Sequence, residues 1–286
     1  MTEEIKNEEQ VAPSVEEKSD VLFEKKDEVV VEKKDETVLE KVETAQVPQE
    51  YDEDEAPGVA DITPDDIATP KYRLLQKTSD EVEAGTGKAG TIVNSSTGQA
   101  FESLNIICLT MKKTRARFDP DNPKAAPLCR SSNLIDGSNC DCGCGNKCDK
   151  CVHTEWTAAA NNKQSPPACG LCYNYPSLTV EAIEKKRAIP TIITFAKSST
   201  EVAQKINTAV LSATQELNDG RIIRKPYWEY VWKIGVKLKP FAKGSAHIYT
   251  AQYLRDATPE EKQWCKNVYR NFIKGKSVVI ENDGEV

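Results

Sequence analysis

Two pairs of cysteines constrain the fold of this 286-residue chain more than any other feature. Cys148 and Cys151 form one C-x-x-C pair, and Cys169 and Cys172 form a second pair after a spacer of seventeen residues. Such pairs are typical of short turns that direct two thiolates at one point, and two turns together make a tetrahedral S4 site for zinc. The pattern therefore predicts a bound Zn²⁺ ion in a small, loop-rich module.

Further cysteines leave the ligand set open. One zinc needs four ligands, and two zincs could use all eight thiols of this region. We expect ligation by Cys148, Cys151 and Cys169, with either Cys172 or Cys129 as the fourth ligand. The C-x-C spacing suits one tetrahedral site less well, and His153 is a further candidate ligand. The remaining thiols are those of Cys140, Cys142 and Cys144. An iron–sulfur cluster on the same thiolates is the competing interpretation.

Charge is divided unevenly along the chain. Residues 1–70 carry 7 basic and 23 acidic side chains, whereas the remainder carries 31 basic and 22 acidic ones. An eight-residue unit at 24–31 recurs at 32–39, and the leader has too little apolar surface to offset the entropy of folding. We expect residues 1–68 to be a disordered acidic arm, which either recruits replication or recombination proteins or only aids solubility. Residues 278–286 form a short acidic tail.

Hydrophobic periodicity predicts a β-rich α+β body over residues 69–277. Period-two alternation indicates long strands at 104–118 and 228–241, with further strands at 72–76, 188–195 and 247–253 and a hairpin at 91–101. Helices are expected at 199–217 and after the capping box that begins at Thr258. The expected architecture is an OB-like, partly closed barrel packed by two helices, with residues 129–172 inserted as a Cys-rich zinc module.

Cations interleaved with aromatic residues predict binding of single-stranded DNA, because cations follow phosphates while aromatic rings stack on bases. If exposed, Tyr230 or Trp232 would stack on a base. Both share one face of a strand with Trp228, so they are alternatively core residues, and the neighbouring lysines alternatively form an ordinary solvated surface. The expected phosphate contacts are Arg115, Arg117, Arg224, Lys225, Lys233, Lys237 and Lys239.

Several classes of protein fit the sequence poorly. The chain has two histidines and no paired-carboxylate motif, and the glycine-rich segment 85–91 lacks the spacing of a phosphate-binding loop, so we expect no enzyme. No segment approaches the roughly 18–20 apolar residues that span a bilayer, and the N-terminus lacks the features of a secretory signal. We therefore expect a cytoplasmic protein without a membrane partner, whose thiols bind metal rather than form disulfides.

A set of short motifs resembles a family of bacteriophage and prophage proteins. The motifs are residues 72–76 followed by Ser79, then Cys129-Arg130-Ser131, Cys148 and Cys151 before Trp156, Pro167-Ala168-Cys169, and Thr194-Phe195 before Ser198-Ser199. This weakly characterised zinc-knuckle family is thought of as single-stranded DNA-binding or replication-associated. The resemblance thus implies a non-enzymatic DNA-binding protein of a phage replication or recombination system in the host cytoplasm. The second cysteine pair and the triplet at 140–144 depart from the family pattern.

Two other functions remain open at this point. The chain could be a structural or protein-interaction component of a virion, in which zinc stiffens a docking module. It could also be a zinc-ribbon transcription factor, although the sequence shows no helix-turn-helix and no basic recognition helix.

Overall fold

The computed structural model describes residues 68–122, 125–158, 164–241 and 244–274. The predicted acidic tail at 278–286 and all but the last residue of the predicted acidic arm at 1–68 lie outside the described residues. Among the described residues, none of the helices is long and apolar enough to cross a membrane.

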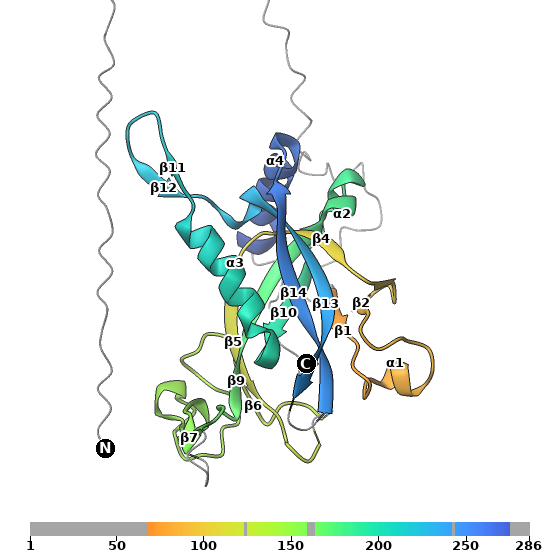
Figure 1. Ribbon diagram of the computed structural model, residues 1–286. Coiled ribbons are helices and arrows are strands. Elements are labelled where there is room, and N and C mark those ends of the chain that lie inside the picture. The colour runs from red at the N-terminus through yellow and green to blue at the C-terminus, as the bar shows by residue number, and fades with distance from the viewer. Residues whose placement is uncertain (1–67, 123–124, 159–163, 242–243, 275–286) are drawn as a thin grey trace, which may run out of the picture. The chain divides into compact units, whose positions relative to one another are not determined.

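A ten-stranded sheet forms the body (Figure 1). Its main path runs β14-β13-β4-β9-β10-β1-β2-β3, and β5 and β6 extend from β9. Most neighbours are antiparallel, whereas β1 and β10 are parallel. The strands of this sheet are β1 (Lys71–Leu74), β2 (Ile92–Asn94), β3 (Ala100–Phe101), β4 (Leu104–Cys108), β5 (Lys112–Arg117), β6 (Cys129–Ser131), β9 (Cys169–Thr179), β10 (Thr191–Ala196), β13 (Tyr230–Phe241) and β14 (Gly244–Asp256).

The sheet curls, so that β14 at one end of the path approaches the segment after β1. The side chain of Gln76 donates to the backbone oxygen of His247 at 2.9 Å and accepts from its backbone nitrogen at 3.0 Å. The hydroxyl of Tyr249 donates to the backbone oxygen of Tyr72 at 3.4 Å. These bonds connect two strands that are far apart along the path of the sheet.

Short elements surround the sheet. Two small hairpins pair β7 (Thr157–Ala158) with β8 (Gln164–Ser165) and β11 (Thr214–Glu216) with β12 (Ile222–Arg224). The α-helices are α1 (Asp80–Glu83), α2 (Val180–Glu184), α3 (Thr200–Ser212) and α4 (Pro259–Val268). Single turns of 3₁₀-helix lie at η2 (Cys148–Lys150), η3 (Val152–Thr154), η4 (Lys197–Ser199) and η5 (Tyr227–Glu229), and a π-helical turn, η6 (Tyr269–Lys274), follows α4.

Helices pack on both faces of the sheet. Neighbouring residues of a strand point to opposite faces, so Ile106 and Trp232 lie on one face while Ile107 and Val231 lie on the other. The first face forms the main core with α3, through Ile206 among others. The second face packs against α2 and α4. The two longer helices begin near their predicted starts, and α4 has the predicted capping box of Thr258 and Glu261.

The mixed α+β class predicted from sequence is confirmed, with a curled sheet. The OB-like assignment is not confirmed, since an OB-fold has five strands and this sheet has ten.

Candidate metal centre

The segment between β6 and β9 holds most of the cysteines and has little core of its own. Among its described residues, 132–158 and 164–168, the buried side chains are Cys148 and Cys151. A long loop without apolar contacts of its own needs another source of order. Its order in this structure comes from backbone turns and from thiols that face one another.

Local hydrogen bonds fold this segment back on itself. The side-chain oxygen of Asn133 accepts from the backbone nitrogens of Ile135 and Asp136, both at 2.8 Å. The backbone nitrogen of Cys148 donates to the oxygen of Ile135 at 2.9 Å, which holds η2 beside this turn. Gly143 and Gly145 have φ of 73° and 61°, a region that glycine adopts without strain, so the chain turns tightly on both sides of Cys144.

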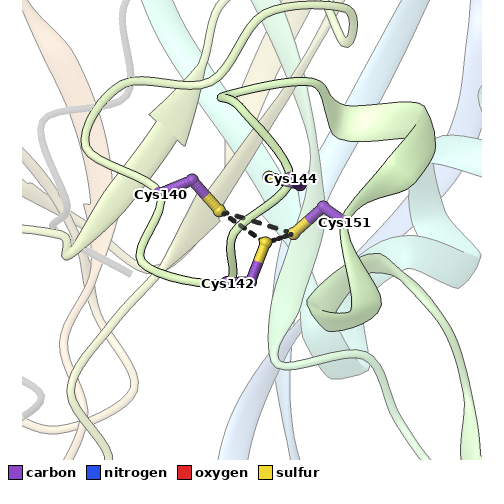
Figure 2. A group of neighbouring side chains, drawn as sticks. All are labelled: Cys140, Cys142, Cys144 and Cys151. Carbon is purple, nitrogen blue, oxygen red and sulfur yellow. Dashed lines mark hydrogen bonds between the residues drawn. The ribbon is translucent and has the colours of Figure 1, made fainter.

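Four cysteines lie close enough to bind one metal ion. The sulfur atoms of Cys140, Cys142, Cys144 and Cys151 all lie within 4.8 Å of one another. The sulfurs of Cys140, Cys142 and Cys151 point toward one another (Figure 2). Their separations are 3.2 Å (140–142), 3.6 Å (140–151) and 3.4 Å (142–151). A zinc–sulfur bond of about 2.3 Å places the corners of a tetrahedron about 3.8 Å apart. The three distances are about 0.2–0.6 Å shorter than this value, so small shifts bring this thiol cluster (Cys140, Cys142, Cys144 and Cys151) to the spacing of an S4 site.

The thiol cluster differs from the predicted ligand set. Cys151 belongs to both sets, whereas the C-x-C residues, which were expected to suit one site poorly, supply the other three thiols. Cys129, Cys148 and Cys169 are buried nearby and line one pocket together with Cys140, Cys144 and Cys151. The structure thus brings three of the other predicted ligands next to the thiol cluster.

Cys172 lies apart from these cysteines. Residues 169–174 form a regular ladder with β5, in which Arg117 pairs with Cys169 and Thr114 pairs with Cys172. Residues three apart in a strand point to opposite faces, so the thiol of Cys172 faces away from that of Cys169. Cys172 is therefore not placed as a fourth ligand beside Cys169, because this C-x-x-C sequence forms a strand and not a turn.

Burial and neighbouring thiols shift the acidity of the cysteines in different directions. Hydrogen bonds from Cys144 and Cys140 lower the pKa of Cys142 to about 6. Burial raises the pKa of Cys129 to about 12 and that of Cys169 to about 11. One thiolate is thus favoured near neutral pH in the thiol cluster, whereas the buried thiols require a cation beside them to ionise.

Two predicted phosphate contacts, Arg115 and Arg117, lie beside this centre. Arg117 on β5 is 8% exposed; it pairs with Asp141 at 2.7 Å and contacts His153. Arg115, two residues earlier, donates to the backbone oxygen of Cys169 at 3.1 Å. The guanidinium of Arg117 therefore holds the cysteine-rich loop against β5, and His153 contacts an arginine.

The predicted stacking residues are buried in the main core. Tyr230 is 8% exposed and Trp232 is 1% exposed, so neither ring offers a face to a base in this structure. The alternative interpretation as core residues is the one that the structure supports. Three of the predicted phosphate contacts lie on the surface, namely Lys233, Lys237 and Arg224. Lys225 is half-buried, as is Lys239, whose ammonium lies 3.7 Å from Glu201.

A polar pocket beside β6 was not predicted from sequence. It has a volume of about 260 Å³ and is lined by two arginines, Arg115 and Arg130, and by hydroxyl-bearing and other residues: Thr114, Ser131, Ser132, Asp136, Gly137 and Ser138. Asp136 is paired with Lys147. The Cys129-Arg130-Ser131 motif was noted only as part of the family resemblance, and only the fold brings it beside Arg115, through the pairing of β5 with β6.

The fold and the cysteines define a mixed α+β protein with a cysteine-rich module between two strands of its sheet. The family model of Pam3 phage gp34-like proteins matches residues 34–277, so the chain belongs to this family of phage-associated proteins. This confirms the phage association that the short motifs indicated. No curated protein and no solved structure matches the chain.

Proposed function

We propose that this protein binds single-stranded DNA in a phage replication or recombination system, without catalysing a reaction, and that Zn²⁺ orders its cysteine-rich module. The observation that carries the DNA proposal is the polar pocket beside β6. There, two guanidinium groups and several hydroxyl groups line one cavity.

Zinc is the metal that suits the donors of the thiol cluster. Four thiolates are soft ligands, which favour Zn²⁺, Cu⁺ or an iron–sulfur cluster over oxygen-seeking cations. All four ligands come from protein side chains, as in structural zinc sites, whereas catalytic zinc sites keep one position for water or substrate. The zinc is therefore proposed to be structural, and a colourless, metal-loaded protein would distinguish it from an iron–sulfur protein.

The polar pocket has the chemistry of a phosphate site. Arginine presents a planar array of donors that matches phosphate oxygens, and serine hydroxyl groups add uncharged hydrogen-bond donors. Because Arg115 also donates to the backbone of Cys169, its side chain is held in place next to the cysteine-rich module. Loss of the metal is thus expected to disturb the phosphate site as well.

Two exposed lysines on β13 form a second group of cations. Lys233 and Lys237 lie on the face of β13 opposite Trp232, and their cross-strand partners on β14 are the uncharged residues Gln252 and Ile248. Like-signed charges on this face attract a polyanion without reading its sequence. With Tyr230 and Trp232 buried, binding would depend mainly on phosphate contacts. The structure confirms the α+β class, and an OB-like surface that binds DNA stays a prediction.

Fluorescence anisotropy with labelled single-stranded and duplex oligonucleotides, over a series of salt concentrations, tests this function. We expect a preference for single strands and an affinity that falls steeply with salt. Arg130→Gln should weaken binding and reduce the salt slope by about 0.7, the value for one phosphate contact on a single strand. Arg221→Gln is the matched control, since Arg221 is an exposed arginine on the β11–β12 hairpin, paired with Asp219. Equal effects of the two substitutions, or no preference for single strands, would refute the proposal.

A structural or protein-interaction role in a virion is the second candidate. Three large apolar side chains of the cysteine-rich module are strongly exposed, namely Ile135 (60%), Val152 (58%) and Trp156 (61%). Such a surface suits a protein partner better than a polyanion. The same titration separates the two functions, because a protein-docking module would show no salt-dependent binding of oligonucleotides.

A further inference from the structure

Three buried thiols lie beside the thiol cluster in one pocket, and they come from three different elements. Cys129 lies on β6, Cys148 begins η2 and Cys169 begins β9, and their exposed fractions are 5%, 7% and 3%. They are not members of the hydrophobic clusters formed by the described residues. Their neighbours are other cysteines, because six cysteines line the small pocket in which all three lie.

The sheet sets the positions of two of these thiols. Cys129 and Cys169 both pair with Arg117 of β5, one from each side, so they occupy the same face of the sheet on β6 and β9. The backbone nitrogen of Cys148 donates to the oxygen of Ile135, and η2 thereby presents Cys148 to the same pocket. Three thiols from distant parts of the sequence thus converge on one place.

Cys140 connects this group to the thiol cluster. It lines the small pocket together with Cys129, Cys148 and Cys169, and its sulfur also lies 3.2 Å from Cys142 and 3.6 Å from Cys151. One sulfur therefore stands between two sets of three thiols.

We propose that the module binds two divalent metal ions that share the thiolate of Cys140. The first ion is the zinc of the thiol cluster, on which this inference rests. The second ion is a Zn²⁺ bound by Cys129, Cys148 and Cys169 together with Cys140. Each zinc then has the four sulfur ligands that it requires, and seven thiols satisfy both because one of them bridges.

Charge supports this arrangement. Seven thiolates and two Zn²⁺ ions leave three negative charges, and two basic residues of β5 lie beside the ligands. Arg115 donates to the backbone oxygen of Cys169, and Arg117 pairs with both Cys129 and Cys169 in the sheet. Because β6 and β9 supply two ligands of the second ion, this ion fastens the cysteine-rich loop to the sheet. The sulfurs of the second site are more widely spaced than those of the thiol cluster. Among the described residues, the thiol cluster is the only group of three or more candidate ligand atoms that all lie within 4.8 Å of one another. Binding of the second ion therefore draws β6, η2 and β9 together.

Counting zinc in the full-length, reduced protein tests the proposal. Elemental analysis and native mass spectrometry should give two zinc ions per chain. Cys148→Ser should leave one ion, because it removes a ligand of the second site only, and Cys142→Ser should also leave one. Cys172→Ser is the matched control: it removes a buried cysteine that faces away from the pocket, and should retain two ions. A count of one in the wild-type protein would overturn the second site and retain the first, whereas a count of zero would overturn both.

A titration with Co²⁺ keeps the inference testable if a cysteine variant does not fold. Cobalt replaces zinc in thiolate sites and gives visible absorption bands from its tetrahedral environment. In the wild-type chain the thiolate-to-cobalt absorption should rise over two equivalents, and the second equivalent should alter the bands of the first through the shared thiolate. Saturation after one equivalent, or two equivalents with independent spectra, would refute a shared pair of ions.

Discussion

Replacing Trp232 with alanine should destabilise the protein by about 3–5 kcal/mol, the range for removal of a large buried aromatic side chain. The side chain is 1% exposed and belongs to the main core. On β13 it pairs with Ile106 of β4. The centroid of its ring lies 6.1 Å from that of Tyr253 on β14, and the two ring planes meet edge-on at 78°. The substitution therefore opens a cavity where three strands of the sheet meet.

A milder substitution checks the cause of this loss. The Nε1 of Trp232 is buried and has no hydrogen-bond partner among the described residues. A buried donor without a partner costs about 1–3 kcal/mol, so Trp232→Phe removes this cost while it loses only part of the packing. We therefore expect Trp232→Phe to destabilise the protein much less than Trp232→Ala.

Urea unfolding followed by circular dichroism measures both effects. Trp156→Ala is the control, because Trp156 is 61% exposed and its loss should change the free energy of unfolding by no more than about 0.5 kcal/mol. Under conditions where the variants are folded, their affinity for a single-stranded oligonucleotide should stay within about twofold of wild type. If Trp232→Ala kept wild-type stability and lost oligonucleotide binding, the ring would be a stacking platform and the assignment to the core would be wrong.

Three further predictions concern the exposed lysines, an ion pair and a glycine beside a cysteine. The double substitution of Lys233 and Lys237 by glutamine should lower the salt slope of oligonucleotide binding by about 1.4, measured by anisotropy, if each lysine meets one phosphate. Hydrogen bonds from Arg255 lower the pKa of Glu261 below its usual 4.5, so this carboxylate stabilises the fold above that pH and the contribution is lost as the pH falls through the lowered pKa. Urea midpoints between pH 7 and pH 3 should show this loss in the wild type and a smaller one in Glu261→Gln. Gly137→Ala places a methyl group 3.1 Å from the sulfur of Cys129 and should weaken zinc binding in a chelator competition, whereas Gly170→Ala, whose nearest contact is 3.9 Å away, should not.

Local patterns predicted much of the fold, because they depend only on neighbouring residues. The alternation at 228–241 corresponds to β13, and the segment predicted as one strand at 104–118 forms β4 and β5, which both pair with β9 around a break at 109–111. The capping box at Thr258 marks the start of α4. The arrangement of ten strands in one curled sheet depends on pairings between distant segments, which no local pattern reveals.

The ligand set could be predicted only in part, since spacing does not distinguish a turn from a strand. Cys148 and Cys151 flank a 3₁₀ turn, as expected of a C-x-x-C pair, whereas Cys169 and Cys172 lie on opposite faces of β9. The sequence disfavoured the C-x-C residues because C-x-C spacing suits one tetrahedral site less well, yet the positive φ angles of Gly143 and Gly145 let the chain turn so that these thiols face one another. The basic residues posed the same difficulty, because a cationic side chain can bind either a phosphate or a carboxylate of the same chain, as Arg117 binds Asp141.

Removal of the metal should unfold the cysteine-rich module and leave the sheet folded. The described residues of 132–168 contribute no side chain to the hydrophobic clusters, which draw instead on β1, β2, β4, β9, β10, β13, β14 and the helices α2, α3 and α4. Structural zinc contributes on the order of 10 kcal/mol to the folding of small modules, whereas apolar burial in the sheet does not depend on it. Hydrogen exchange read by mass spectrometry should therefore show faster exchange at 132–158 and 164–168 after a chelator is added, with unchanged protection at 173–179 and 230–238. Loss of protection in both regions would mean that the metal holds the whole fold together, and unchanged protection in both would mean that the module is ordered without a metal.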